Sequence, residues 1–236
     1  MLISGWGQNL KHECCVKFPK DLDELKQGLK KGSAISRGNG RSYGDSSLNK
    51  NNTISMLNFN HLINFNASTG QLVVEAGVLL KDIISIFLPK GWFPSVSPGT
   101  KFVTVGGMLA ADVHGKNHHN EGSIRNFVDW IELLVPSGNI IKCSDIKNKD
   151  LYNWTIGGMG LTGVIVKAAI KLRRVETGWI KQRVISTSNL KETIKAFDKN
   201  NNATYSVAWI DCTQLGKKIG QSLVMLGEHA KINELT

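Results

Sequence analysis

The residues best suited to chemistry lie in one stretch of the chain, residues 98–119, with the sequence PGTKFVTVGGMLAADVHGKNHH. Its glycines let the backbone come close to a ligand, because glycine has no Cβ. Directly after them, HGKNHH places three histidines and a lysine within six residues. Titratable side chains that follow a glycine-lined backbone are what a cofactor site with a reaction centre needs.

The same histidines could suggest a metal site, but their spacing does not support one. His114, His118 and His119 lack the HExxH and Cys/His spacings of zinc sites, and Asp112 is the only carboxylate nearby. We therefore expect no metal. We expect His119 to serve only in hydrogen bonding within the loop.

Two further glycine-rich segments, residues 36–45 and 157–163, resemble the first in texture. The first of these, SRGNGRSYGD, is neither a Walker A motif nor GxGxxG. It offers backbone N–H groups, a guanidinium and a hydroxyl, which can hold a pyrophosphate, although alone it is equally typical of a surface turn. Three such segments far apart in the sequence favour a dinucleotide such as FAD over a single phosphate.

Hydrophobic periodicity and turn residues predict the elements that must position these segments. The expected helices are 19–31, 78–88, 147–154 and 190–199. The expected strands are 34–36, 53–57, 71–76, 128–135, 140–143, 164–172, 179–186 and 205–211. This mixture predicts an α+β or α/β fold. The texture changes after residue 176, where we expect a second domain that ends in a loop-like tail.

Composition limits the partners and the compartment. Lys and Arg total 29 against 19 Asp and Glu, a net charge of +10, but the basic residues are scattered and not interleaved with stacking aromatics. We expect no nucleic-acid partner, while anionic ligands or an anionic membrane surface stay open. The four cysteines form no CxxC pair, and no signal-peptide pattern opens the chain. We expect a cytoplasmic protein, with peripheral attachment to the inner membrane face as the alternative.

Several motifs, in the same order along nearly the whole chain, resemble those of the vanillyl-alcohol oxidase superfamily, whose FAD-binding domain has the PCMH-type fold. The motifs that carry the resemblance are GWG (5–7), RGNGRSYGD (37–45), AGV (76–78), PGT (98–100), VTVGG (103–107), DVHGKNHH (112–119), GS (122–123), GGMGLTGVI (157–165) and YSVAW with the following Asp211 (205–211). No single motif is specific, but together they are.

The resemblance implies an α+β chain with a PCMH-type FAD-binding domain of two α/β subdomains over residues 1–175. Residues 176–236 would begin an α+β substrate (cap) domain. Members of the family are roughly twice as long, as a second domain of ordinary size would make them. We therefore expect the later cap segments to come from elsewhere, as a continuation or as a second chain.

The resemblance also implies the cofactor and its contacts. Because Arg41, Ser42 and Tyr43 stand where covalent relatives often carry a histidine, we expect non-covalent FAD. The implied cofactor-binding residues are Arg37, Gly38, Asn39, Gly40, Arg41, Ser42, Tyr43, Gly44, Gly99, Thr104, Val105, Gly106, Gly107, Ala111, Asp112, Val113, His114 and Ile165. The implied catalytic residues are His114, as a proton relay, and Lys116, which would stabilise developing negative charge.

The implied activity is that of an FAD-dependent oxidoreductase in cell-wall precursor biosynthesis. It would oxidise a secondary hydroxyl of a sugar, the 2'-OH of a polyprenylphosphoryl pentose, to a ketone. It would pass electrons to a separate acceptor and work beside a short-chain reductase. Two alternatives stay open: an aldonolactone or alditol oxidase of the D-arabinono-1,4-lactone oxidase type, and a non-catalytic FAD-binding fragment or subunit.

Overall fold

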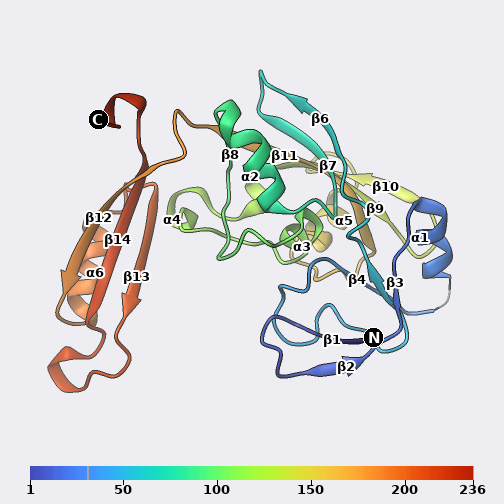
Figure 1. Cartoon of the computed structure of the whole chain (residues 1–236), viewed down its shortest axis with the longest axis horizontal. Coiled ribbons are helices and arrows are strands. Elements are labelled where there is room, and N and C mark those ends of the chain that lie inside the picture. Colours follow the sequence, from blue (N-terminus) through green and yellow to red (C-terminus); the bar gives the residue numbers. More distant parts are fainter. Residues whose placement is uncertain (31, 236) are drawn as a thin grey trace.

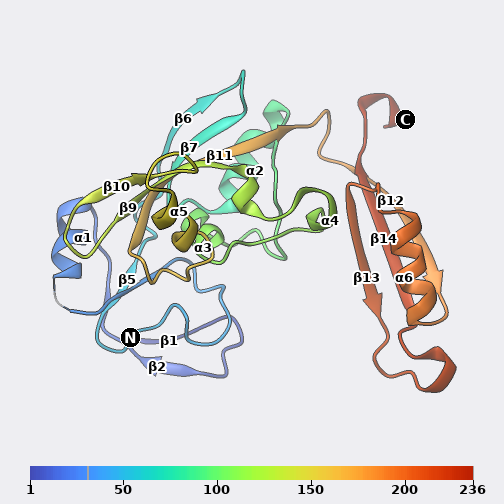
Figure 2. The ribbon, with the colours of Figure 1, turned by 180° about the vertical axis from the view of Figure 1, so that it is seen from behind.

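The computed structural model describes residues 1–30 and 32–235 (Figure 1). The expected α+β class is confirmed, because helices and strands of mixed order alternate along the chain. Everything up to β11 gathers around one large sheet and a smaller one. The remaining elements form a separate sheet with one helix, which both views show beside the first group (Figures 1 and 2).

The large sheet has the strand order β10-β9-β11-β7-β6, and β8 pairs with the far end of β11. All of its pairings are antiparallel. The strands are β6 (Leu62–Asn66), β7 (Gln71–Glu75), β8 (Trp92–Pro94), β9 (Val128–Leu134), β10 (Ile140–Cys143) and β11 (Val164–Arg174). Because β11 pairs with three other strands, it is the element to which the rest of the sheet is attached.

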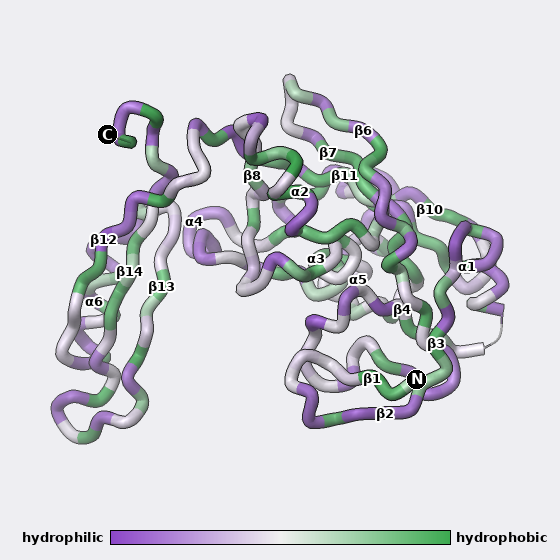
Figure 3. Tube along the Cα trace, in the orientation of Figure 1, coloured by the Kyte–Doolittle hydropathy of each residue, from purple (hydrophilic) through white to green (hydrophobic). Residues whose placement is uncertain are grey.

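The main core lies between this sheet and three helices, α2 (Leu80–Phe87), α3 (Val105–Ala110) and α5 (Lys149–Thr155). Figure 3 shows hydrophobic positions along the central strands of the sheet and along α2. Tyr152 of α5 is fully buried, and its hydroxyl donates to the carbonyl oxygen of Val128 at 3.2 Å. Its burial raises the pKa of the Tyr152 hydroxyl to about 12.

A second, smaller core joins the amino-terminal elements to the same sheet. Parallel strands β3 (Val16–Lys17), β5 (Thr53–Ser55) and β4 (Ile35–Arg37) form a three-stranded sheet covered by α1 (Leu22–Leu29). Val164 and Val166 of β11 pack into this core, whereas Ile165 packs into the main one. The amino terminus adds the two-stranded sheet of β1 (Leu2–Ser4) and β2 (Lys11–Glu13).

The C-terminal elements were only partly expected. Strand β12 (Ile180–Thr187), helix α6 (Leu190–Lys199) and strand β13 (Tyr205–Ile210) match the expected pattern. The expectation of a loop-like tail is wrong, because β14 (Ser222–His229) inserts between β12 and β13. Buried and exposed residues alternate along β14: Val224 and Leu226 are buried, while Leu223 is exposed on the opposite face. The sequence analysis had assigned this segment to the loop that precedes it.

Other boundaries differ in smaller ways. Helix α1 begins after its N-cap Asp21, whose side chain accepts from Asp23 and Glu24 N–H, and ends at Leu29. We expected the first helix to end at Lys31 and the second domain to end at Thr236, and both residues lie outside the described residues. The sequence analysis also did not predict strands β1, β2, β3, β6 and β8 or the short helices α3 and α4 (His118–Glu121). The 3-10 helices are Leu88–Lys90, Ile124–Phe127, Gly216–Lys218 and Ile232–Glu234. Within the described part, no helix has the length and apolar character to cross a membrane.

Two turn glycines allow a matched test of packing around β11. Gly70 and Gly138 both have left-handed φ angles, +73° and +88°. A Cβ on Gly70 would lie 2.6 Å from the carbonyl oxygen of Leu172 and 2.6 Å from the Trp92 ring, whereas one on Gly138 meets nothing within 4 Å. We expect Gly138→Ala to cost about 1 kcal/mol of unfolding free energy through its backbone angle. Gly70→Ala should cost about 2 kcal/mol more through overlap. Urea unfolding measures both, and equal losses would contradict the packing described here.

Candidate functional site

The three glycine-rich segments, far apart in the sequence, meet in one cleft between the large sheet and the sheet of β3, β5 and β4. They are joined there by Met56 and Ala76. The lining residues are Ser36, Gly38, Asn39, Gly40, Arg41, Ser42, Ser46, Ser47, Met56, Ala76, Val103, Thr104, Gly106, Gly107, Ala110, Ala111, Val113, Met159, Gly160, Gly163 and Ile165. Of the expected cofactor contacts, Arg37, Tyr43, Gly44, Gly99, Val105, Asp112 and His114 are not part of this lining.

The glycine-rich loop that begins at Gly38 is held against the start of α3 by a close contact between Gly38 and Thr104. Thr104 is the N-cap of α3, and its hydroxyl oxygen accepts from the N–H of Gly107 at 3.2 Å. Gly38 lies directly against the same Thr104 side chain, so that an added Cβ would overlap its Oγ1. Asn39 adds a side-chain bond to the carbonyl oxygen of Phe102 at 2.9 Å. These contacts hold two of the glycine-rich segments together.

Arg37 supports the loop from behind instead of lining the cleft. Its guanidinium donates to the carbonyl oxygen of Ser4 at 2.7 Å and to Ser47 Oγ at 3.0 Å. The guanidinium lies so close to Gly40 that a side chain there would overlap it. Burial lowers the pKa of Arg37 from its usual value. This arginine thereby ties the loop to strand β1.

Arg41 presents the positive charge of the loop to the cleft. Its Nη1 donates to the carbonyl oxygen of Asn39 at 2.9 Å, and its guanidinium carbon lies 5.2 Å from the centre of the Trp6 ring. The Nε of Arg41 is buried without a hydrogen-bond partner among the described residues. A buried donor of this kind calls for an acceptor, and an anionic group in the cleft would supply one.

The remainder of the cleft has walls of small residues and backbone. Gly107 and Ala111 are exposed to it, and the N–H of Gly106 donates to the carbonyl oxygen of Ala76 at 2.7 Å. The segment that leads into β11 is attached to α3, because the N–H of Met159 donates to the carbonyl oxygen of Ala110 at 2.8 Å. A long ligand with a flat ring and a phosphate end fits this combination of small walls and an unpartnered arginine. Within residues 1–30 and 32–235, no three His, Cys, Asp or Glu side chains cluster as metal ligands.

A second cavity lies between this region and the C-terminal sheet. Lys116, Phe93 and Ser97 line it from the amino-terminal part of the chain. The lining residues from the C-terminal sheet are Ile180, Gln182, Tyr205, Ser206, Val207, Trp209, Met225, Leu226 and Gly227. Val113 lines the first cleft and Lys116 the second, so residues 113–116 connect the two cavities.

The remaining polar residues of the motif have other contacts. The His114 ring centre lies 5.0 Å from that of His118, and the two rings are tilted. Asp112, with φ of 42°, accepts from the backbone N–H of Arg125 at 3.2 Å and pairs with its Nε at 3.5 Å. His119 hydrogen-bonds outside its own loop, since its Nε2 lies 2.9 Å from the carbonyl oxygen of Ala203.

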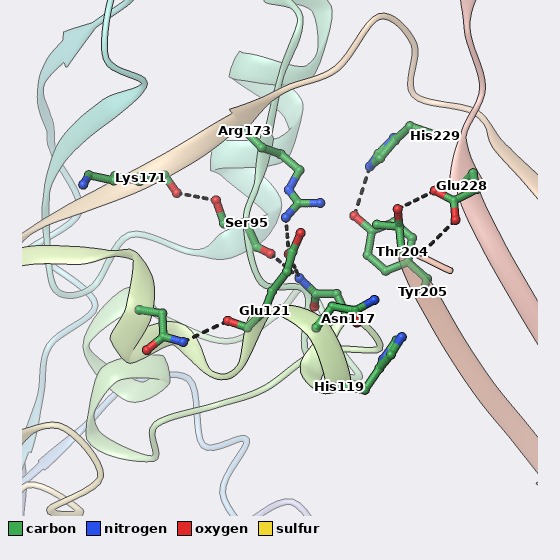
Figure 4. A network of polar contacts seen from close by, with 12 residues as sticks. Ser95, Asn117, His119, Glu121, Lys171, Arg173, Thr204, Tyr205, Glu228 and His229 are labelled. Carbon is green, nitrogen blue, oxygen red and sulfur yellow. Dashed lines mark hydrogen bonds and ion pairs between the residues drawn. The ribbon is translucent and has the colours of Figure 1, made fainter. Parts of the chain in front are cut away.

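The sequence analysis missed a polar network that includes Tyr205, one of the residues that line the second cavity (Figure 4). Tyr205 and His229 lie on neighbouring strands, with the hydroxyl oxygen and Nε2 3.0 Å apart. Burial, and next the charge of Arg173, lower the pKa of His229. Burial raises the pKa of the Tyr205 hydroxyl. Only the YSVAW motif pointed to this region, and β14, which supplies His229, had not been expected.

Comparisons with known proteins agree with the geometry of the first cleft. A sequence profile of the family described as FAD binding domain matches residues 15–144. Decaprenylphosphoryl-beta-D-ribose oxidase of Mycolicibacterium smegmatis is 35% identical over 99% of this chain and 53% of its own length. D-lactate dehydrogenase of Archaeoglobus fulgidus is 33% identical over 42% of this chain and 24% of its own length. Cytokinin dehydrogenase 9 of Oryza sativa subsp. japonica is 32% identical over 59% of this chain and 27% of its own length. The chain spans about half the length of the first of these relatives.

The lowered pKa of His229 predicts a defined dependence of stability on pH. In the unfolded chain a histidine has a pKa of about 6.5, so below that pH the unfolded state binds a proton that folded His229 resists. Stability should therefore fall as the pH drops from about 7 to about 5. We expect His229→Gln to show a shallower fall in unfolding free energy over that range. Measurement at higher pH, where the histidine is neutral, gives the packing cost alone. Parallel pH profiles for the two proteins would contradict the burial of His229.

Proposed function

Because this chain belongs to the family of FAD-binding domains, we propose that it carries the flavin of an oxidoreductase that oxidises a secondary hydroxyl of a sugar to a ketone. FAD is its cofactor. The observation that supports the activity is the pair of cavities joined by residues 113–116, one lined by glycine and the other by Lys116 and an apolar sheet face. The proposed substrate is a polyprenylphosphoryl pentose, whose 2'-hydroxyl would be oxidised.

The residues of the first cleft would hold FAD without a covalent bond. Arg41 and the loop at residues 38–42 would bind the pyrophosphate. The small residues of α3 and the segment 159–165 would contact the ring system. Bound FAD supplies the two-electron acceptor for alcohol oxidation. Tyr43 is 76% exposed and does not line the cleft, so it would form no covalent bond to FAD.

The chemistry of the second cavity supports an amphipathic anionic substrate. Phe93, Val207 and Met225 are among the apolar residues of its lining, and Lys116 contributes a positive charge. The exposed faces of Trp209 (72%) and Val184 (53%) extend the same side of the C-terminal sheet. Apolar surface and one ammonium group match a lipid tail and a phosphate, whereas a soluble lactone would leave most of this surface unused.

Lys116 and His114 are the proposed catalytic residues. The ammonium of Lys116 would stabilise negative charge on the substrate oxygen as its proton leaves. The imidazole of His114, which lies against His118 and is exposed, would receive that proton and relay it to solvent. We further propose that residues 176–236 begin the substrate domain. Electrons would leave to a separate acceptor, and the ketone product would pass to a short-chain reductase.

Cofactor binding can be tested with two glycines of the expected site. Gly38→Ala would push a methyl group against Thr104 Oγ1, whereas a Cβ on Gly99 meets nothing within 4 Å. We expect Gly38→Ala to weaken FAD binding at least about tenfold and Gly99→Ala to stay within about twofold, because only the first requires the loop to move. Quenching of flavin fluorescence on titration measures both. The flavin should leave with the supernatant on acid precipitation; flavin that stays with the protein would contradict the non-covalent mode.

The activity can be tested by anaerobic bleaching of the FAD-loaded protein. We expect a polyprenylphosphoryl pentose to bleach the flavin faster than an aldonolactone, an alditol or D-lactate. Lys116→Met should slow that bleaching at least about tenfold with unchanged flavin content, since it removes charge stabilisation and not cofactor contacts. Faster bleaching by the lactone or alditol would instead identify a soluble-sugar oxidase. Bound FAD that no alcohol bleaches would support a non-catalytic subunit.

A further inference from the structure

The segment that carries Lys116 is held by a buried polar anchor. Asn117 is 0% exposed, although its neighbours Lys116 and His118 are exposed. The side-chain amide of Asn117 donates to the carbonyl oxygen of Ser95 at 2.8 Å and to the carboxylate of Glu121. Ser95 in turn donates to the carbonyl oxygen of Lys171 on β11 at 2.9 Å. The backbone beside Lys116 is therefore tied to the central strand (Figure 4).

Glu121 connects this anchor to a charged group near the end of β11. Its carboxylate accepts from Asn117 and pairs with the guanidinium of Arg173. The side chains of Arg173 and Glu121 are 20% and 29% exposed. Arg173 Nε is buried without a partner within the described ranges, so Glu121 provides the charge that compensates this guanidinium. Removal of one partner from a partly buried ion pair leaves the other uncompensated.

The same short segment binds the C-terminal sheet on its other side. The N–H of Ser206, on β13, donates to the carbonyl oxygen of Lys116 at 2.9 Å. The carbonyl oxygen of Ala203 lies 2.9 Å from His119 Nε2 and accepts from the Asn120 amide at 3.1 Å. Lys116 is thus held between β11 on one side and β13 on the other.

We propose that Glu121 is a positioning residue that, through Arg173 and Asn117, fixes Lys116 in the second cavity and holds β13 against it. That Lys116 then acts on substrate rests on the proposed function, whereas the coupling of Glu121 to Lys116 and β13 does not. Glu121 itself does not line either cavity. Its effect reaches the cavity through the backbone of residues 116–121.

Hydrogen exchange of Glu121→Gln, read by mass spectrometry, tests the coupling without substrate. This change keeps the size of the side chain and removes its charge. We expect the Ser206 amide to exchange about tenfold faster, because local opening of its bond to Lys116 becomes easier. Labelling of the Lys116 amine by an amine-reactive reagent should also change in rate. The matched control is Glu132→Gln, since Glu132 pairs with Lys167 at 3.6 Å and is 25% exposed but lies outside the network. It should leave both readouts unchanged.

A double-mutant cycle separates positioning from general destabilisation. Arg173→Gln, Glu121→Gln and the double variant should raise the Ser206 exchange rate by about the same factor, because each removes the same ion pair. If Glu121→Gln does not fold, Glu121→Asp, which keeps the charge but shortens the side chain, should still raise the Ser206 exchange rate above that of the unchanged protein. Unchanged Ser206 exchange, additive effects of the two single variants, or an equal rise in Glu132→Gln would overturn the proposal. None of these readouts depends on turnover, so a failed substrate test leaves the proposal standing.

Discussion

The structure depends on one strand, β11, which pairs with three other strands and packs into two hydrophobic cores. Its first residues alternate between two cores, with Val164 and Val166 in one and Ile165 in the other. A register shift follows between Ile165 and Lys167, and Ala168 and Ile170 then pack into the main core. A bulge of this kind changes which face of a strand each side chain meets. The strand can therefore contribute to both cores near the glycine-lined cleft and only to the main core farther along. Near its end Arg173 pairs with Glu121.

The glycine-lined cleft follows from this arrangement, because its three segments are attached to elements that β11 keeps in place. Residues 159–165 lead into β11 itself, while α3 is bonded to Ala76 directly after β7, the neighbour of β11. The loop at 38–47 follows β4, and Arg37 of β4 ties it to β1 through its bonds to Ser47 and Ser4. Backbone lines much of the cleft, so its shape depends on main-chain hydrogen bonds more than on rotamers. Small walls of this kind suit a ligand with a flat ring.

Local patterns predicted most of the elements but fewer of the contacts. The extent of α6 is a short-range feature, and the expected helix at 190–199 matches it. Strand β14 was missed because its alternation follows a loop and because its partner β12 is separated from it by α6 and β13. The glycines pointed to the cleft, and eleven of the expected contacts line it. The partnership of Glu121 with Arg173 spans 52 residues, and no local pattern encodes it. The assignment of individual residues to FAD stays a prediction.

Only two residues separate Val113, in the glycine-lined cleft proposed to hold FAD, from Lys116, in the second cavity. A connection this short leaves little slack, so a ligand that shifts the backbone at one end also shifts it at the other. Any such effect is reciprocal: a molecule in the second cavity that changes the affinity for flavin has its own affinity changed by the same factor when flavin binds. Communication between the two sites would then need no movement of a domain, since the same few peptide units form part of both walls.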